Sequence, residues 1–445
     1  MTAAPAMTAA PPMTAAPAMT AAPAPVPAPR LVVVGQGYVG LPIAMRAVQV
    51  GFSVLGLDVD ARRVSCLNTG RSYIEDVSDD KLAAALASGR YRTSVSYDDA
   101  AGFDAAIITV PTPLKDGKPD LSFIEAAARG IAPHVTRGAL VVLESTTYPG
   151  TTEELLVPLL EVGSGLVAGE DFDVGYSPER IDPGNAVWTL VNTPKLVSGI
   201  NESSLIAVDA LYSRLVDKTV PVCAPKEAEL AKLLENTFRH VNIALVNEIA
   251  VFANELGVDV WEAIDAAATK PFGYMRFTPG PGVGGHCLPV DPVYLSWQIR
   301  RHLHREFRFV ALANDINDHM PDYVVKRVSR ALTRRHRSLR GSRILLLGIA
   351  YKANTGDMRG SPAIRVVQLL QEQGAEVEVV DSHVEPHRCP PEVKLVTLSA
   401  DGLRHADVVV VLADHEDVDY ALVERVADCV IDTRHRLTGA QVEYL

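Results

Sequence analysis

A cysteine and an aspartate lie close together in the glycine-rich stretch GPGVGGHCLPVD, residues 280–291. A thiolate is a strong nucleophile that can add to a carbonyl carbon, and a carboxylate four residues later can bind water or accept a proton. Glycines before the thiol would let the backbone approach a bound ligand closely. Cys287 and Asp291 are therefore candidates for covalent catalysis. The alternative is that Cys287 is an inert thiol in a tight turn.

Lys232 and Asn236 form a second candidate pair, because they lie four residues apart in a helical pattern and could face a reactive group together. Both lie in residues 226–257, which contain no proline, no internal glycine and apolar residues at every third or fourth position. This pattern predicts one continuous helix, on which residues four apart share a face. The alternative is that Lys232 and Asn236 belong to a polar face of this helix that is exposed to solvent. A helix of this length is typical of a spine between domains and of a dimer contact.

A glycine pattern near the start of the chain predicts a dinucleotide site. The stretch RLVVVGQGYVGLPIAM, residues 30–45, gives a short strand, glycines at positions 35, 37 and 40, and then a helical pattern. Backbone N–H groups at such a turn can bind a pyrophosphate. A second strand ends at Asp58, whose carboxylate can bind a ribose hydroxyl and would repel a 2'-phosphate, which favours NAD over NADP. The alternative is a glycine turn that only packs a helix on a strand.

The elements around these residues predict an α/β fold with two Rossmann-like doubly wound domains joined by the long central helix. Further strands are expected at 104–110, 139–145, 172–177 and 194–200. A second unit of strand, loop, helix and strand spans residues 342–381. It lacks the GxGxxG pattern, and its loop carries Lys352 and Arg359 in place of the glycines. Later strands at 406–415 and 429–435 complete it. Two such domains predict one site for a dinucleotide and another for a nucleotide-bearing substrate.

Composition limits the kinds of partner. The 445 residues have a formal net charge of -12, which argues against nucleic-acid binding. The cysteines have no metal-ligand spacing and are odd in number, which argues for a reducing, cytoplasmic location and against a metal site. No run is long enough to predict a membrane span. Residues 1–29 repeat MTAAPA with small variations and predict a disordered tail.

Eight motifs occur together in order: GxGxxG with Asp58, VPTP, EST, SPER, AKLLENT, GPGVGGHCLPVD, YKANTGDMRGSP and DTR. In these motifs the chain resembles the UDP-glucose/GDP-mannose dehydrogenase family from residue 30 to about 436. Residues around the cysteine most resemble the branch that oxidises UDP-N-acetylhexosamines. The resemblance implies that a sugar C6 alcohol is oxidised to a carboxylate in two NAD-dependent steps, through a thiohemiacetal and a thioester on cysteine.

The resemblance also implies roles for individual residues. Cys287 would be the nucleophile, Lys232 and Asn236 the oxyanion support, and the remaining catalytic residues would hold or activate water: Asp291, Glu179 and Thr146. The implied cofactor contacts are Gly35, Gly37, Tyr38, Val39, Gly40, Asp58, Arg63, Thr112 and Arg359. The implied contacts with the nucleotide-sugar are Arg180, Gly282, Gly284, Gly285, Lys352 and Arg434.

The domains expected on this basis are a tail (1–29), an NAD-binding Rossmann domain (30–215), a central helical domain with the cysteine loop (216–325) and a C-terminal nucleotide-sugar-binding domain (326–445). A homodimer through the central helix is expected. The competing functions are a two-electron β-hydroxyacid or 6-phosphogluconate-type dehydrogenase, which needs no cysteine, and a non-catalytic NAD-binding paralogue. The sugar stays open among UDP-N-acetylglucosamine, UDP-N-acetylmannosamine, UDP-glucose and dTDP-glucose.

Overall fold

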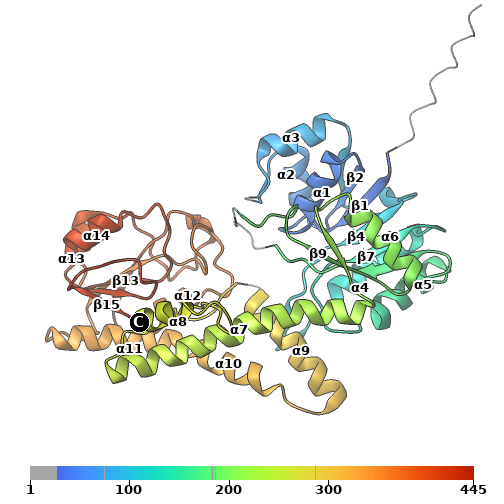
Figure 1. Ribbon diagram of the computed structural model, residues 1–445. Helices are drawn as coiled ribbons and strands as arrows, with labels where there is room; N and C mark the ends of the chain where they lie inside the picture. Colours follow the sequence, from blue (N-terminus) through green and yellow to red (C-terminus); the bar gives the residue numbers. More distant parts are fainter. Residues whose placement is uncertain (1–27, 75, 182–184, 186, 286) are drawn as a thin grey trace, which may run out of the picture.

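Two α/β domains lie at opposite ends of a long helix in the computed structural model (Figure 1). The structure describes residues 28–445 except 75, 182–184, 186 and 286. The predicted tail therefore lies almost wholly outside the described residues.

Within the described residues, the N-terminal sheet has eight strands in the order β10-β9-β8-β7-β4-β1-β2-β3. Neighbouring strands are parallel except β8 and β9, which pair antiparallel. The order reverses between β1 and β4, and ligands bind at such a reversal in doubly wound sheets. The strands are β1 (Arg30–Val34), β2 (Ser53–Leu57), β3 (Tyr91–Ser94), β4 (Ala105–Ile108), β7 (Leu140–Leu143), β8 (Asp173–Tyr176), β9 (Lys195–Gly199) and β10 (Thr219–Pro221).

Helices cover both faces of this sheet because its strands are apolar on both sides. Along β1, Leu31 and Val33 belong to one core cluster, while Val32 and Val34 belong to another on the opposite face. This is the alternation that a strand of period two produces. The helices are α1 (Gly40–Gln49), α2 (Ala61–Asn68), α3 (Asp79–Ala87), α4 (Ser122–Ile131), α5 (Val157–Ser164) and α6 (Glu202–Tyr212). A small hairpin joins β5 (Leu114–Lys115) to β6 (Lys118–Pro119).

The predicted spine is a single helix, α7 (Pro225–Leu256), of 32 residues, which corresponds to about 48 Å. It begins at a proline, which has no N–H to leave unpaired in the first turn, and it ends at Gly257 in the left-handed conformation. Figure 1 shows α9 and α10 lying along α7 between the two domains. The central helices after α7 are α8 (Val260–Ala268), α9 (Cys287–Leu303), α10 (Arg308–Asp318) and α11 (Met320–Arg334).

The C-terminal sheet, within the described chain, has five parallel strands in the order β12-β11-β13-β14-β15. The strands are β11 (Arg343–Leu347), β12 (Glu376–Val380), β13 (Val408–Val411), β14 (Val430–Asp432) and β15 (Val442–Tyr444), and the helices are α12 (Pro362–Glu372), α13 (Ala400–His405) and α14 (Tyr420–Val426). The predicted fold of two Rossmann-like domains joined by a long helix is therefore confirmed. Among the described helices, none is both long and apolar enough to cross a membrane.

Candidate active site

The glycine turn after β1 has the shape that a bound pyrophosphate requires. Gly35 has φ +93°, and a Cβ there would lie 2.7 Å from the Thr109 carbonyl oxygen. At Gly40, where α1 begins, a Cβ would lie 1.9 Å from the Gly35 oxygen, so helix and strand pack closely. At Gly37 a Cβ would meet no described atom within 4 Å, which leaves space at the helix N-terminus. Val39 is the N-cap of α1. The turn thus fits the pyrophosphate of a dinucleotide.

Asp58 lies directly after β2 and is held in place by backbone amides. Its carboxylate accepts hydrogen bonds from the N–H of Gln36 and of Asp60, both at 2.9 Å. Arg63 on α2 makes a 3.5 Å ion pair with it. A carboxylate fixed at this edge fits the ribose of NAD, and the contact itself stays a prediction.

Helix α9 packs against the loops that follow β4 and β7. The Tyr294 hydroxyl of α9 donates to the Pro113 carbonyl at 3.2 Å, next to the buried Thr112. Gln298, one helical turn further on, donates to the Pro149 carbonyl at 3.3 Å. Thr146, in the same loop as Pro149, is half-buried. The helix that starts at Cys287 therefore lies against the ligand-binding edge of the N-terminal sheet.

Lys232, Asn236 and Asp291 come together between α7 and α9. All three side chains are buried, at 7%, 5% and 2% exposure, so the solvated-face alternative is excluded. The Asn236 amide donates to Asp291 Oδ2 at 2.5 Å. Burial raises the pKa of Asp291 to about 6, while the Lys232 charge and the Asn236 hydrogen bond act in the opposite direction. The result is a carboxylate that can exchange a proton near neutral pH.

Cys287 is the first residue of α9, and its side chain lies outside the described residues. Its position in the helix places it one turn before Asp291.

Glu179 and Arg180 follow β8 and face α7. Glu179 accepts hydrogen bonds from the backbone N–H groups of Arg180 and Ile181. Burial raises the pKa of Glu179, and the charge of Lys232 opposes this. The Arg180 guanidinium pairs with Glu235 at 2.7 Å and donates to the Pro194 carbonyl at 2.7 Å. Arg180 thus ties this loop to α7, and its predicted contact with substrate stays a prediction.

The glycine loop before α9 packs against the C-terminal domain. Gly285, at φ +84°, donates its N–H to the Arg359 carbonyl at 2.8 Å. A Cβ at Gly284 would lie 2.6 Å from Tyr351 Cβ, and one at Gly282, at φ +128°, 3.0 Å from Pro362. The loop therefore needs glycine for this close approach.

Residues of the C-terminal domain also reach the NAD-binding side. The Arg359 guanidinium lies 5.1 Å from the ring centroid of Tyr38, which belongs to the glycine turn of the first domain. Asp357 holds that guanidinium through hydrogen bonds from both Nε and Nη2. Arg434 lies against the glycine loop, since a Cβ at Gly280 would meet its Nη1 at 2.8 Å. The structure thus brings Arg359 to Tyr38 and Arg434 to the glycine loop, and Lys352 is half-buried in the same loop as Arg359.

Comparison with known proteins agrees with this geometry. The NAD binding domain of the UDP-glucose/GDP-mannose dehydrogenase family matches residues 29–216, its central domain matches 226–319, and its UDP binding domain matches 345–439. The chain belongs to this family. The resemblance seen in the sequence is confirmed, and the family is one of NAD-dependent nucleotide-sugar dehydrogenases, so NAD is the cofactor.

Individual relatives of the family are similar over nearly the whole chain. The UDP-N-acetyl-D-mannosamine dehydrogenase of Pyrococcus horikoshii is 38% identical over 87% of this chain and 90% of its own length. The UDP-N-acetyl-D-glucosamine 6-dehydrogenase of Salmonella typhi is 36% identical over 87% of this chain and 90% of its own length. A solved structure of the UDP-D-ManNAc dehydrogenase from Pyrococcus horikoshii has a TM-score of 0.83 at 34% identity and covers 93% of this chain and 98% of that one.

Sequence reasoning missed a buried cluster beside this family's site. Lys195 is the first residue of β9, and its ammonium contacts the carboxylates of Glu144 and Glu179. Tyr212 of α6 donates its hydroxyl to Glu144 at 2.8 Å. The signal in the sequence was a charged residue near one end of an otherwise apolar strand: Lys195 is the second residue of PKLVSGI, and Glu144 is the second-last residue of ALVVLES.

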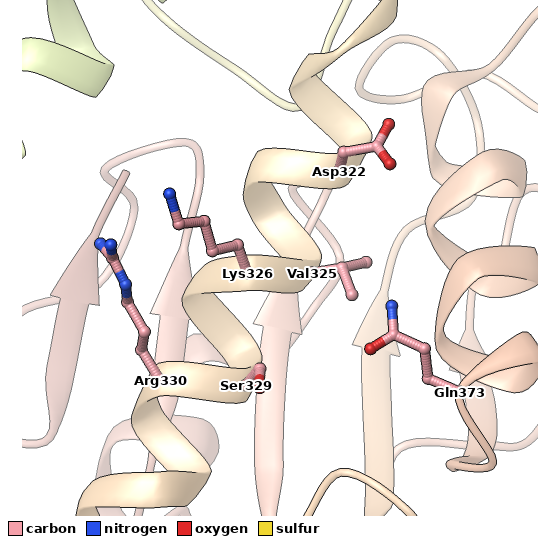
Figure 2. Close-up of a pocket in the computed structure, with 6 residues that line it drawn as sticks. All are labelled: Asp322, Val325, Lys326, Ser329, Arg330 and Gln373. Carbon is pink, nitrogen blue, oxygen red and sulfur yellow. The ribbon is translucent and has the colours of Figure 1, made fainter.

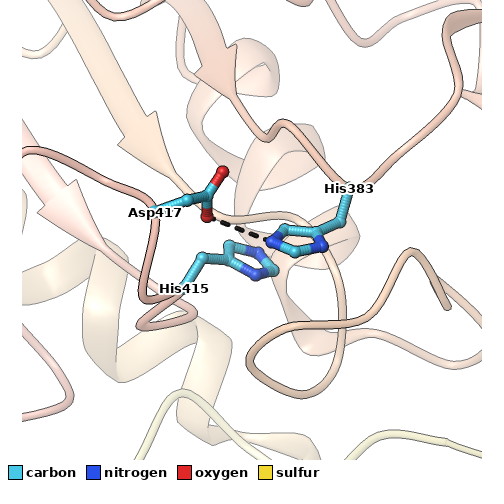
Figure 3. A group of neighbouring side chains, drawn as sticks. All are labelled: His383, His415 and Asp417. Carbon is cyan, nitrogen blue, oxygen red and sulfur yellow. Dashed lines mark hydrogen bonds and ion pairs between the residues drawn. The ribbon is translucent and has the colours of Figure 1, made fainter. Parts of the chain in front are cut away.

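Two other groups of polar residues lie away from the family's site. Among the described residues, His383, His415 and Asp417 are close enough together to hold a metal ion (Figure 3). Both nitrogens of His415 are already used, because Nδ1 accepts from the Asn354 N–H at 2.9 Å and Nε2 lies 3.1 Å from Asp381. The two imidazoles stack rather than converge, so this cluster supports the loop after β11.

A surface pocket of about 290 Å³ lies beside α11 (Figure 2). Figure 2 shows Lys326 and Arg330 extending from one side of the helix, away from Asp322 and Gln373. The charged groups that line this pocket therefore do not converge on one point.

Proposed function

We propose that this chain oxidises the C6 alcohol of a UDP-sugar to the carboxylate, with two NAD reduced per sugar. The observation that carries the proposal is the buried group of Lys232, Asn236 and Asp291 beside the helix that begins at Cys287. Two further facts support oxidation of the sugar C6 alcohol. The chain belongs to a family of nucleotide-sugar dehydrogenases, and the site holds a cation, an amide donor and a carboxylate in fixed positions.

NAD supplies the hydride acceptor of each oxidation. We assign its binding to residues 30–215, with Arg359 reaching from the C-terminal domain. The residues proposed to hold it are Gly35, Gly37, Tyr38, Val39, Gly40, Asp58, Arg63, Thr112 and Arg359.

The proposed role of Cys287 follows from the chemistry of the second oxidation. An aldehyde has no carbinol carbon from which hydride can leave, so the thiolate first adds to it and forms a thiohemiacetal. Lys232 and Asn236 stabilise the oxyanion on that carbon. Oxidation then gives a thioester, and its hydrolysis releases the carboxylate and restores the thiolate. Thr146, Asp291 and Glu179 hold and deprotonate the water that attacks.

The proposed substrate is a UDP-N-acetylhexosamine, either UDP-N-acetylglucosamine or UDP-N-acetylmannosamine. UDP-glucose and dTDP-glucose are the alternatives to compare. The names of the two curated relatives and the family's UDP binding domain support this class. We assign nucleotide-sugar binding to residues 326–445 together with the glycine loop of the central residues 216–325. The proposed contacts are Arg180, Gly282, Gly284, Gly285, Lys352 and Arg434.

The test counts NADH per sugar for UDP-N-acetylglucosamine, UDP-N-acetylmannosamine, UDP-glucose and dTDP-glucose. We expect two NADH from one of the UDP-sugars, and we expect Cys287→Ser to form no more than trace sugar acid, because a serine ester replaces the thioester at best. One NADH per substrate with a fully active Cys287→Ala would instead establish the two-electron dehydrogenase. NAD binding without turnover of any of these sugars would establish the non-catalytic alternative.

We further propose that two copies pair through α7. Its exposed apolar side chains recur every three, four or seven residues and so form one stripe along the helix. The stripe consists of Leu230, Leu234, Phe238, Leu245, Ile249, Phe252 and Leu256. A continuous apolar face of this kind is typical of a protein interface, and a second copy of the chain offers the matching surface.

We also propose a cytoplasmic location, which follows from the cysteine usage of the sequence. Fractionation of cells that express the tagged chain would test it, with NAD-dependent activity expected in the cytoplasmic fraction. Activity confined to another fraction would contradict it.

A further inference from the structure

Lys195 is a buried cation that the proposed mechanism does not use. It is 4% exposed and lies at the start of β9. Its ammonium contacts one carboxylate oxygen of Glu144 and lies 3.4 Å from Glu179 Oε2. The ring centroid of Tyr212 is 5.3 Å away. One buried lysine thus serves two carboxylates, and the second of them belongs to the candidate active site.

A structural role would need only one of these carboxylates. Glu144 at the end of β7 is fully buried and is already bonded to Tyr212, so a pair with Lys195 would satisfy both charges. Glu179 instead lies on the loop after β8, where two backbone N–H groups fix one oxygen and leave the other toward Lys195. The cation therefore orients the outer oxygen of Glu179 as well as neutralising Glu144.

We propose that Lys195 is a positioning residue that acts through Glu179, holding this carboxylate ionised and oriented for the hydrolysis of the thioester. The inference rests on the proposed function. In that step the water oxygen bonds to the acyl carbon, its proton passes to Glu179, and the carbon–sulfur bond breaks to return the thiolate of Cys287. Glu179 must be ionised to accept the proton.

The charges around Glu179 set the direction of the effect. Burial raises the pKa of Glu179, whereas the charges of Lys232 on α7 and of Arg180 on its own loop lower it. Lys195 on β9 adds a cation in direct contact. Burial and the charge of Lys232 lower the pKa of Lys195 itself. Its contacts with Glu144 and Glu179 act the other way and favour the ammonium form. Removing the charge of Lys195 therefore raises the pKa of Glu179, and less of it is ionised at neutral pH.

The experiment measures the breakdown of the acyl-enzyme directly. Enzyme, NAD and the UDP-sugar that the parent enzyme turns over are mixed, quenched in acid at intervals and analysed by intact-protein mass spectrometry over a range of pH. For Lys195→Met we expect the midpoint of the rising limb of the breakdown rate to move up by about one to three pH units, the usual effect of losing a charge at this distance. The acyl-enzyme then accumulates at neutral pH and clears at high pH.

Companion variants separate the inference from a loss of folding. Glu144→Gln with Lys195→Met removes one charge of each sign, so the fold keeps its charge balance while Glu179 still lacks the cation. An upward shift is expected here too, smaller than for Lys195→Met alone because the Glu144 charge is also gone. In Glu144→Gln alone, Lys195 has Glu179 as its one remaining carboxylate partner in this cluster. The midpoint of the breakdown rate is then expected to move to lower pH. Lys195→Arg keeps the positive charge and should have the same pH midpoint as the parent enzyme. Lys218→Met makes the same kind of change at an exposed site just before β10, and it should also leave the midpoint unchanged.

The outcomes distinguish this inference from the proposed function. If the parent enzyme makes one NADH per sugar and no acyl-enzyme, the proposed function fails and the inference fails with it. If the parent makes two NADH and the folded double variant lowers the breakdown rate equally at every pH, Lys195 has only a structural role and the inference alone is overturned.

Discussion

At the scale of single residues, Asp291 combines a demanding environment with a proposed role in catalysis. The carboxylate is 2% exposed, and burial raises its pKa from an ordinary value of 3.8 to about 6. Lys232 and Asn236 offset part of this cost without cancelling it. At neutral pH the folded enzyme therefore holds a buried negative charge that it would hold more easily as a neutral group.

Replacing Asp291 with asparagine should stabilise the fold while lowering activity. Between about pH 4 and 6 the folded state keeps a proton that the unfolded chain has released, so the free energy of unfolding falls as pH rises through this window. The amide that replaces the carboxyl group does not ionise. We expect Asp291→Asn to be more stable than the parent by up to roughly 3 kcal/mol at pH 8, from about two pKa units at 1.36 kcal/mol each.

Urea unfolding at pH 4 and pH 8 checks this, and the two proteins should be equally stable at pH 4. Asp315→Asn, at an exposed site, is the control and should change stability little at either pH. A variant that is less stable than the parent at pH 8 would show that Asp291 is held mainly by attraction to Lys232, contrary to our expectation.

At the scale of elements, the loop after β11 is held by His415, a buried histidine that is not itself among the proposed site residues. The His415 imidazole accepts from the Asn354 N–H through Nδ1, so its proton is on Nε2 and points to Asp381. Asn354 has φ +58°, and its side chain accepts the Glu416 N–H at 2.8 Å. His415 therefore fixes the middle of the loop that carries Lys352 and Arg359.

Removing this imidazole should weaken substrate binding more than it slows turnover. His415→Ala leaves the Asn354 N–H without its partner and removes one of three hydrogen bonds to Asp381 Oδ2, which destabilises the loop by about 1 to 3 kcal/mol. We expect KM for the UDP-sugar to rise about tenfold or more, with a smaller change in kcat. His383→Ala is the matched control, because that ring stacks on His415 but donates only to exposed Asp417. Equal KM values for the two variants would show that the loop does not depend on His415.

The elements themselves were predictable, and many contacts between them were not. The spacing of apolar residues predicted α7, and the strand followed by glycines at 35, 37 and 40 predicted the first Rossmann turn. Both patterns are local in the chain, so they can be recognised without knowing the fold. Cys287 was expected in a glycine-rich loop, whereas it begins a helix. The pairing of Arg180 with Glu235 and the burial of Lys195 could not be predicted, because they depend on how β8, β9 and α7 pack in space.

At the scale of the whole molecule, the two Rossmann-like domains share a backbone arrangement, a glycine turn after the first strand and an aspartate after the second. The aspartate has different partners in each domain. Gly35 and Gly348 both have left-handed φ, and each donates its N–H to the last residue of the next strand, Leu57 or Val380. The carboxylate that follows is Asp58 in one domain and Asp381 in the other. Asp58 is held by two backbone amides and an exposed arginine, whereas Asp381 accepts four backbone N–H groups and also contacts His415. Asp381 is therefore already used within its own domain and is not free to bind a dinucleotide ribose.

Helix α7 joins the two domains, so its exposed apolar stripe affects how the whole molecule can assemble. A stripe of large apolar residues on the spine would be costly in water, and a second copy would bury it. We expect the parent protein to be a dimer and the double variant Leu234→Glu with Phe252→Glu to be a monomer. Val162→Glu places the same charge at an exposed apolar site of the N-terminal domain, at 85% exposure, and should leave the dimer intact. Sedimentation velocity at micromolar concentration measures all three proteins, and a parent that sediments as a monomer would leave the apolar stripe of α7 to a different partner.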